Sequence, residues 1–408
     1  PHSGAKQMKN CYRPVRCRKI ADNRYQFFNH NYFENAALSV KYTYFTNGVE
    51  TYSSTFDVNI APQSSQEYEI DSLELEKDNH NSVVFEYLAG DFLIASEQII
   101  LSEGKLSADI NSDGKTAVKP SENKLYITFD NGSMIFDKST GFITSYIYKN
   151  HEMINSFPLG DFKGFAPAFY RAPLDNDRNI CKYWHTMGLQ NTSNICKGSN
   201  FTDNGDNIVV TTNIKSLANC ILPVANTQIK YTIYPNGNIS VDVNCLGGGA
   251  VKLLPRFGVM LEMPKEYENI KYFGLGEDVN LPDYKEHTIN KVYQTTVDKL
   301  KEDYIKPQES ATRCDVRFAE ITNASGFGLR FEAVNKPFIF SASHYTSNQW
   351  AKAMHRDDLV DLPTTCVNID SSVLGAGSNA CGPLPDKKDR VGSLSGKKLS
   401  FVVKPIGE

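Results

Sequence analysis

Apolar and polar residues alternate in short runs along most of the chain, and turn residues separate these runs. Three pairs of runs flank an Asn-Gly step, at Asn47-Gly48, Asn131-Gly132 and Asn236-Gly237. A period of two places apolar side chains on one face of a strand, and Asn-Gly adopts the positive φ angles of tight hairpin turns. The pattern therefore predicts three β-hairpins, with strands at 40–45, 125–129, 133–136, 229–234 and 239–243.

Helical periodicity over three turns is nearly absent from the chain. The segment 290–303 and the segment around Trp350 are the best candidates for short helices. We therefore predict an all-β protein.

A polar segment with little apolar pattern, between Leu101 and Ser121, divides the chain. About seven short strands are predicted before it, which is typical of an immunoglobulin-like sandwich. No repeat of fixed period is present in the rest. The roughly 290 residues that follow are too many for one small sandwich, so we expect a single large antiparallel supersandwich there.

The charge of the chain is nearly balanced, with 43 basic and 47 acidic residues and a net charge of −4. Proteins that bind nucleic acids carry a basic stripe, and membrane helices need about 18 or more consecutive apolar residues. The sequence shows neither feature. We expect no nucleic-acid partner and no membrane contact.

Nine cysteines are present, an odd number, and no Cys-x-x-Cys pair occurs. A disulfide framework or a zinc site would show tighter spacing. We interpret the cysteines as mostly buried, reduced thiols of a cytoplasmic protein. Because the first residue is Pro1, we also expect the chain to have been cut from a longer protein.

The segment 169–177 reads Phe-Tyr-Arg-Ala-Pro-Leu-Asp-Asn-Asp, an Arg-Ala-Pro turn that leads into three hydrogen-bonding side chains. It resembles a signature in the C-terminal region of large β-galactosidases of glycoside hydrolase family two. Six further blocks resemble that region in the same order. They are 1–2 with 9–15, 61–62, 131–133 with 140–143, 274–276 with 280–283, 307–317, and 368–370 with 375–379 and 381–383.

This resemblance implies an order of domains. It implies an exit segment from a missing catalytic barrel at 1–15, an immunoglobulin-like β-sandwich at 16–103, a linker at 104–120 and a supersandwich at 121–408. The supersandwich would be of the galactose-mutarotase-like kind. Since two-chain β-galactosidases have a small subunit with little more than the last domain, an excised C-terminal piece fits this chain better.

The resemblance also implies the function. The whole enzyme would hydrolyse terminal non-reducing β-D-galactose, as in lactose-type substrates. The catalytic carboxylates would lie in the upstream barrel, so we predict that this chain is inactive alone. It would brace the barrel of the same or a separate chain, complete the sugar pocket and support a homo-oligomer.

Two groups of site residues follow from the resemblance. The residues expected at the rim of the sugar pocket are Glu309, Ser378, Asn379 and Cys381. The residues expected to hold the structural motif are Arg171, Asp175, Asn176, Asp177, Asn280, Asp283 and Arg313. Cys381 stands where some relatives have a Trp that stacks on the sugar, and a Cys can line a wall but cannot stack.

Three other positions depart from the family pattern. Val279 stands where a Glu is usual, Tyr284 where an Arg is usual, and Ala311 replaces a Gly. The first two changes would remove both charges of one local ion pair. The third would stiffen its loop.

We expect no catalytic residue, no metal ligand and no cofactor in this chain. The acid pairs Glu277-Asp278 and 175/177 lie in turns, where acids usually cap the backbone or face solvent. His355 is typical of a surface residue, and His344 with Trp350 of core and rim. Two alternatives stay open: an aldose 1-epimerase-like enzyme, in which a His and a carboxylate act together, and a carbohydrate-binding module.

Overall fold

The computed structural model describes residues 2–108, 110, 113–154, 164–378 and 380–407. It is an all-β protein made of antiparallel sheets, as the sequence predicts. The chain forms two compact units. Unit 1 comprises residues 1–105, 273–278 and 284–293, and unit 2 comprises residues 106–272, 279–283 and 294–408.

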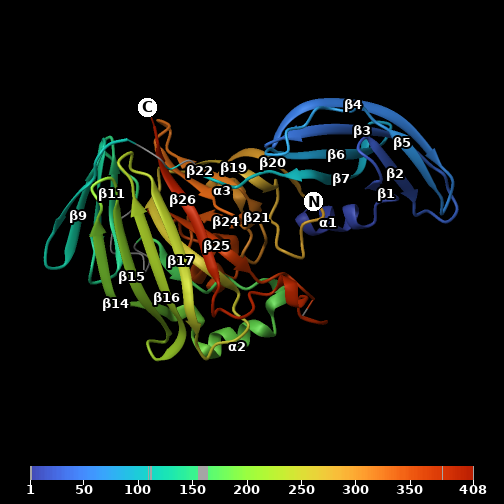
Figure 1. The fold of residues 1–408 in the computed structure, drawn as a ribbon. Helices are drawn as coiled ribbons and strands as arrows, with labels where there is room; N and C mark the ends of the chain where they lie inside the picture. The colour runs from blue at the N-terminus through green and yellow to red at the C-terminus, as the bar shows by residue number, and fades with distance from the viewer. Residues whose placement is uncertain (1, 109, 111–112, 155–163, 379, 408) are drawn as a thin grey trace. The chain divides into compact units, whose positions relative to one another are not determined.

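Unit 1 is a sandwich of two antiparallel sheets with seven strands, the number that the sequence predicts (Figure 1). The three-stranded sheet has the order β1 (Val15–Lys19), β2 (Arg24–Asn29), β5 (Ser65–Glu69). The four-stranded sheet has the order β4 (Val49–Ile60), β3 (Ala36–Thr46), β6 (His80–Ala89), β7 (Phe92–Glu103). Aromatic side chains dominate the core between them; Phe27 contacts the rings of Phe56, Phe85 and Tyr87 edge to face.

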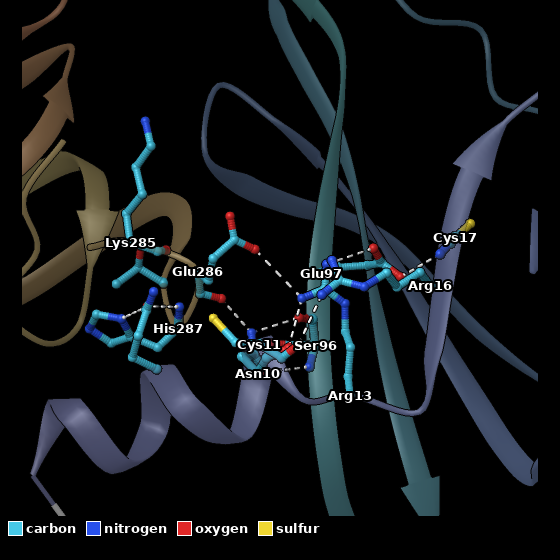
Figure 2. Close-up of polar contacts among 12 residues, drawn as sticks. Asn10, Cys11, Arg13, Arg16, Cys17, Ser96, Glu97, Lys285, Glu286 and His287 are labelled. Carbon is cyan, nitrogen blue, oxygen red and sulfur yellow. Dashed lines mark hydrogen bonds and ion pairs between the residues drawn. The ribbon is translucent and has the colours of Figure 1, made fainter. Parts of the chain in front are cut away.

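Helix α1 (Ser3–Cys11) belongs to unit 1, where the sequence predicts only an exit segment. Its Asn10 side chain donates to the carbonyl oxygens of Ser96, at 2.8 Å, and of Glu286, at 2.5 Å. Arg13, just after the helix, forms ion pairs with Glu97 at 3.2 Å and with Glu286 at 3.5 Å (Figure 2). These bonds fix the helix to strand β7 and to the returning segment 284–293 within unit 1.

Unit 2 contains two five-stranded antiparallel sheets and most of a third sheet. The first has five strands in the order β12 (His151–Glu152), β11 (Phe142–Tyr148), β10 (Gly132–Asp137), β9 (Lys124–Phe129), β8 (Ala117–Pro120). The second has the order β13 (Ala166–Ala168), β18 (Arg256–Pro264), β25 (Thr364–Val373), β24 (Phe338–Ser343), β21 (Arg313–Val316).

The third sheet is the longest among the described residues, and β14 to β17 lie side by side in it (Figure 1). Its order is β14 (Thr192–Asp203), β15 (Ile208–Ala218), β16 (Leu222–Ile233), β17 (Ile239–Gly248), β26 (Lys398–Ile406), β23 (Gly328–Ala333), β22 (Phe318–Thr322), β19 (Asn269–Gly276), β20 (Ile289–Thr296). Burial alternates strictly along most of β15 and β17, so these strands bury one face. Strands β18 and β25 are buried on nearly every residue, so both faces of the second sheet are covered there.

Four α-helices and four 3-10 helices are described. They are α1, α2 (Ile180–Met187), α3 (Val297–Leu300), α4 (Ser347–Lys352), η1 (Asp175–Asp177), η2 (Leu189–Asn191), η3 (Arg356–Asp358) and η4 (Lys387–Asp389). Helix α4 confirms the prediction near Trp350. The predicted helix at 290–303 is wrong for its first half, because 290–296 belong to β20 and only α3 is helical. None of the described helices is long and apolar enough to cross a membrane.

All three predicted hairpins are present. Asn47, Asn131, Gly48 and Gly237 have positive φ angles of 50°, 61°, 76° and 84° in the turns β3–β4, β9–β10 and β16–β17. All nine cysteines are free thiols, but only Cys245, Cys314 and Cys366 are buried. The prediction of mostly buried thiols is therefore wrong, because the other six are at least partly exposed; among them, Cys11 and Cys181 lie on short helices, Cys220 in the turn β15–β16 and Cys381 in a loop.

Gly48 combines a positive φ with close packing, which makes it the most demanding hairpin position. A Cβ added there would lie 2.7 Å from the Phe273 ring and 2.9 Å from the Val292 nitrogen. Gly90, with a φ of 58°, has nothing within 4 Å of such a Cβ. Both substitutions to Ala incur the backbone penalty of about 1–2 kcal/mol, but only Gly48→Ala adds a clash.

We therefore expect Gly48→Ala to lower the melting temperature of unit 1 clearly more than Gly90→Ala does. Differential scanning calorimetry of the two variants and the parent chain measures the difference. Equal effects of the two substitutions would contradict the packing argument.

Candidate functional site

The turn after strand β13 contains a fully buried ion pair. The Arg171 Nη1 lies 2.9 Å from the Asp177 Oδ2, and neither side chain is exposed. The same carboxylate accepts a hydrogen bond from the Leu174 nitrogen at 2.8 Å. Burial raises the pKa of Asp177, and the Arg171 charge opposes that shift. The pair thus closes the turn from Arg171 to Asp177 on itself.

Helix α2, which follows this turn, covers the arginine. The Trp184 ring lies 5.8 Å from the Arg171 guanidinium carbon, within cation–π range. The indole nitrogen of Trp184 donates to the Leu253 carbonyl oxygen at 2.7 Å, so the ring has a fixed position. Hence the guanidinium is shielded from water on this side, which strengthens its attraction to Asp177.

The other two polar residues of the turn contact two different loops. The Asp175 nitrogen donates to the Gln308 Oε1 at 2.9 Å, and the Gln308 Nε2 donates back to the Asp175 carboxylate at 3.2 Å. The Asn176 side chain donates to the Gly377 carbonyl oxygen at 2.6 Å. One turn thereby contacts both the loop 306–312 and the loop 374–383. The partner of Arg171 in this turn is Asp177 and not Asp175.

Asp283 holds the loop 374–383 from a second direction. Its carboxylate accepts hydrogen bonds from the Ala376 nitrogen at 2.7 Å and the Gly377 nitrogen at 2.8 Å. A Cβ on Gly375 would lie 2.5 Å from this carboxylate. The loop can close on Asp283 only because residue 375 has no side chain.

Asn280 and Arg313 connect the segment 279–283 to strand β21. The Asn280 side chain accepts from the Cys314 nitrogen at 2.7 Å, and the Asn280 nitrogen donates to the Thr312 oxygen at 3.1 Å. Arg313 is 1% exposed and donates to the Tyr272 hydroxyl at 3.2 Å and the Leu300 oxygen at 3.1 Å. All seven residues of the predicted structural motif thus lie in one connected region of unit 2.

The residues predicted at the pocket rim have different surroundings. Glu309 is 6% exposed, and its carboxylate accepts from the Ala311 nitrogen at 3.2 Å and the Thr312 hydroxyl at 3.0 Å, so it caps its own loop. Ser378 donates to the Pro383 oxygen at 3.3 Å, and Cys381 is exposed. Asn379 lies outside the described residues. The sugar-facing role of these residues stays a prediction.

A second buried ion pair, which the sequence reasoning missed, lies on strands β18 and β25. The Arg256 Nη2 is 3.1 Å from the Asp370 Oδ2, and the Arg256 Nη1 donates to the Asn368 Oδ1 at 2.9 Å. Burial raises the pKa of Asp370 to about 7; Arg256 opposes this shift, and the Glu309 charge adds to it. The available signal was the presence of Arg256 and Asp370 beside the apolar residues of these two strands, because buried charged residues need partners.

The acid pairs considered for catalysis are not arranged as dyads. Asp177 pairs with Arg171 while Asp175 faces Gln308, and in unit 1 the Asp278 carboxylate pairs with Lys6 at 2.7 Å. His355 lies on the surface, and His344 and Trp350 are buried. Among the described residues, no three His, Cys, Asp or Glu side chains come together as metal ligands.

Fold and site together define an all-β protein in which a buried ion pair closes one turn, and polar residues of that turn hold two loops by hydrogen bonds. A family model described as the β-galactosidase small chain matches residues 128–403. That match covers more than half of the chain. The chain therefore belongs to the β-galactosidase small chain family.

Curated relatives are β-galactosidases. The one from Actinobacillus pleuropneumoniae is 29% identical over 401 residues, which cover 94% of this chain and 38% of the relative. The one from Halalkalibacterium halodurans is 25% identical over 368 residues, which cover 86% of this chain and 35% of the relative. The chain thus spans little more than a third of the length of these relatives.

Among solved structures, galactose 1-epimerase from Lactobacillus acidophilus covers 72% of this chain, with a TM-score of 0.41 and 9% identity. A putative aldose 1-epimerase from Escherichia coli covers 72% of the chain, with a TM-score of 0.35 and 10% identity.

The Arg171–Asp177 pair allows a stability prediction. Arg171→Met leaves a buried carboxylate without its partner, which typically costs about 3–5 kcal/mol. Lys265→Met is the matched control, because its pair with Asp361 is about half exposed and such pairs contribute about 0–1 kcal/mol. Urea unfolding of both variants gives the comparison, and similar losses would mean that the buried pair is not critical.

Asp370 makes unfolding depend on pH. Its pKa is about 7 in the folded chain against an ordinary value of 3.8, so the folded state holds an extra proton between pH 4 and 7. The contribution of this proton to the free energy of unfolding is present in full below pH 4. It decreases as the pH rises from 4 to 7 and is absent above the folded-state pKa.

We therefore expect the parent chain to lose stability relative to Asp370→Asn as the pH is raised from 4 to 8. Urea unfolding of both chains at each pH isolates the contribution of this carboxyl group. A difference between the two chains that stays constant with pH would refute the shifted pKa.

Proposed function

We propose that the chain is the C-terminal region of a β-galactosidase of glycoside hydrolase family two, which removes terminal non-reducing β-D-galactose from lactose-type substrates. The observation that carries this proposal is the match of residues 128–403 to the β-galactosidase small chain. The alignments to β-galactosidases that are more than twice as long support it. In this proposal the remaining part of the enzyme is the catalytic barrel, in the same or a separate chain.

The role of this chain is to brace the barrel and to lend two loops to the rim of the sugar pocket. The two rim loops are 306–312 and 377–383, the second being the end of the loop 374–383. They are held by Asp175, Asn176 and Asp283 through short hydrogen bonds. Preorganised loops bind a ligand without paying to order themselves, so such fastening favours sugar binding. The exposed Cys381 then forms part of the pocket wall, with Glu309 supporting the loop behind it.

The chain alone supplies no catalytic carboxylate in this proposal. Retaining glycosidases need two carboxyl groups about 5–5.5 Å apart, both free to act on the sugar. Here Asp177 and Asp370 are in buried ion pairs, Asp283 binds backbone nitrogens and Glu309 caps its own loop. Engaged acids of this kind are suited to structure and not to proton transfer.

The proposal extends to the surroundings of the enzyme. The complete β-galactosidase is a homo-oligomer in the cytoplasm, and nine free thiols are consistent with a reducing compartment. This chain then contributes subunit contacts besides the rim loops.

Turnover of o-nitrophenyl β-D-galactoside tests the proposal. The purified chain alone should show none, and adding the part of the Actinobacillus relative that precedes the aligned region should produce turnover. Turnover by this chain alone would overturn the missing-carboxylate argument. Association of the two parts without turnover would overturn the rim role.

A variant separates the rim role from simple bracing. Asn176→Leu removes the hydrogen bond to the Gly377 oxygen, and one such bond contributes about 1 kcal/mol. We expect the KM of the mixture to rise about fivefold while the association of the two parts is unchanged. Asn204→Ala, in the exposed turn β14–β15, is the control and should change neither quantity.

A further inference from the structure

Unit 2 contains a cavity of about 380 Å³ that includes no residue of the loops 306–312 and 374–383. It lies where β13, β14, β18 and β25 meet the segments around η2 and the start of α4. Its lining consists of Pro167, Ala168, Phe169, Tyr170, Leu189, Gln190, Asn191, Thr192, Ser193, Asn194, Met260, Thr346, Ser347, Asn348 and Asn368.

The lining of this cavity is mostly polar and carries no charge. Ten of the fifteen residues have neutral polar side chains, and none is charged. Amide and hydroxyl groups can each donate and accept hydrogen bonds. A cavity of this composition suits a ligand that carries many hydroxyl groups and no net charge.

The floor of the cavity is rigid. Met260 and Asn368 are paired residues of β18 and β25, so they share a face of the sheet. Met260 packs against Ala168 in a small buried cluster. The Asn368 side chain is held on both sides, by Arg256 at 2.9 Å and by the Ser341 hydroxyl at 3.3 Å. The floor thus offers an apolar patch beside a fixed amide.

The wall is formed by two short elements that are bonded to each other. The Asn348 side chain, at the start of α4, donates to the Gln190 carbonyl oxygen of η2 at 2.8 Å. The Gln190 side-chain oxygen is buried, and it has no hydrogen-bond partner among the described residues. The hydrogen bond from Asn348 to Gln190 fixes the two elements of the wall relative to each other.

The half-buried Tyr170 also lines the cavity. Its hydroxyl lies 3.1 Å from the His185 Nε2, which fixes the ring. Aromatic rings pack well against the C–H faces of sugar rings, as they do against other apolar surfaces. The cavity volume is at the small end of the range of about 300–1,000 Å³ for ligand sites, so it accommodates one ring.

We propose that this cavity is a binding site for a neutral monosaccharide, separate from the rim loops. A phosphate or carboxylate ligand would need a cationic partner, and an apolar ligand would leave the many amides without hydrogen bonds. A neutral aldopyranose meets both conditions: its hydroxyl groups pair with the amides, and its C–H face covers Tyr170 or Met260.

Saturation-transfer NMR with the intact chain tests the site, with methyl β-D-galactopyranoside as the probe. We expect saturable binding with a Kd on the order of 1 mM, as for a small ligand with few contacts. D-galacturonate, the charged analogue, should bind at least several-fold more weakly. Equal or tighter binding of galacturonate would overturn the inference of a neutral ligand.

Two variants assign the binding to this cavity. Asn348→Ala removes an amide from the wall and should weaken binding about tenfold, and Ser347→Phe fills the cavity and should abolish it. Asn204→Ala is the matched control and should bind like the parent chain. Melting curves establish that each variant is folded. Because two different positions are substituted, the test still works if one of the two variants does not fold.

The rim variant separates this site from the proposed function. Binding that survives both cavity substitutions but is lost in Asn176→Leu would place the sugar at the rim loops and refute the separate site. No saturable binding to the folded parent chain would refute it as well. Neither result bears on whether the chain completes a β-galactosidase, which the turnover of the mixture decides.

Discussion

The buried ion pair between Arg171 and Asp177 is the interaction on which the candidate site depends. Two charges without exposure to water are stable only while they face each other, because either one alone would carry a large desolvation cost. The turn between them is therefore either closed or locally unfolded, with little in between. Since Asp175 and Asn176 lie inside that turn, closing the turn positions the groups that hydrogen-bond to Gln308 and Gly377 of the two loops.

Strand β25 connects this region to the cavity that we propose as a monosaccharide site. Asn368 and Asp370 are two residues apart on the strand, so their side chains share a face of the sheet. Asn368 forms part of the cavity floor, and the charge of Glu309 adds to the raised pKa of Asp370. Arg256 contacts both Asn368 and Asp370. The Arg256 guanidinium thus orients the side-chain amide of Asn368 in the cavity floor, and it also pairs with the carboxylate of Asp370.

Much of the fold could be predicted from the sequence, because hairpins depend on local signals. Asn-Gly turns and alternating runs identify their own strands. Helices α1 and α2 were missed because each has about two turns, too short for a period of 3.6 residues to stand out. The site shows the same limit: the resemblance points to Asp175, Asn176 and Asp283, but two of these bind mainly backbone groups of distant loops, which carry no side-chain signal.

The acids of this region illustrate why a carboxylate motif in a sequence is weak support for catalysis. A catalytic acid must exchange a proton with substrate, so one of its oxygens has to face the reacting atoms. Asp283 uses both oxygens on backbone nitrogens, and Asp177 uses the same oxygen for Arg171 and for a backbone nitrogen. Freeing Asp283 for chemistry would release the loop 374–383, and freeing Asp177 would open the turn that contains Asp175 and Asn176. Structural use of these carboxylates therefore opposes their catalytic use, and in the proposed function hydrolysis draws on acids from another part of the enzyme.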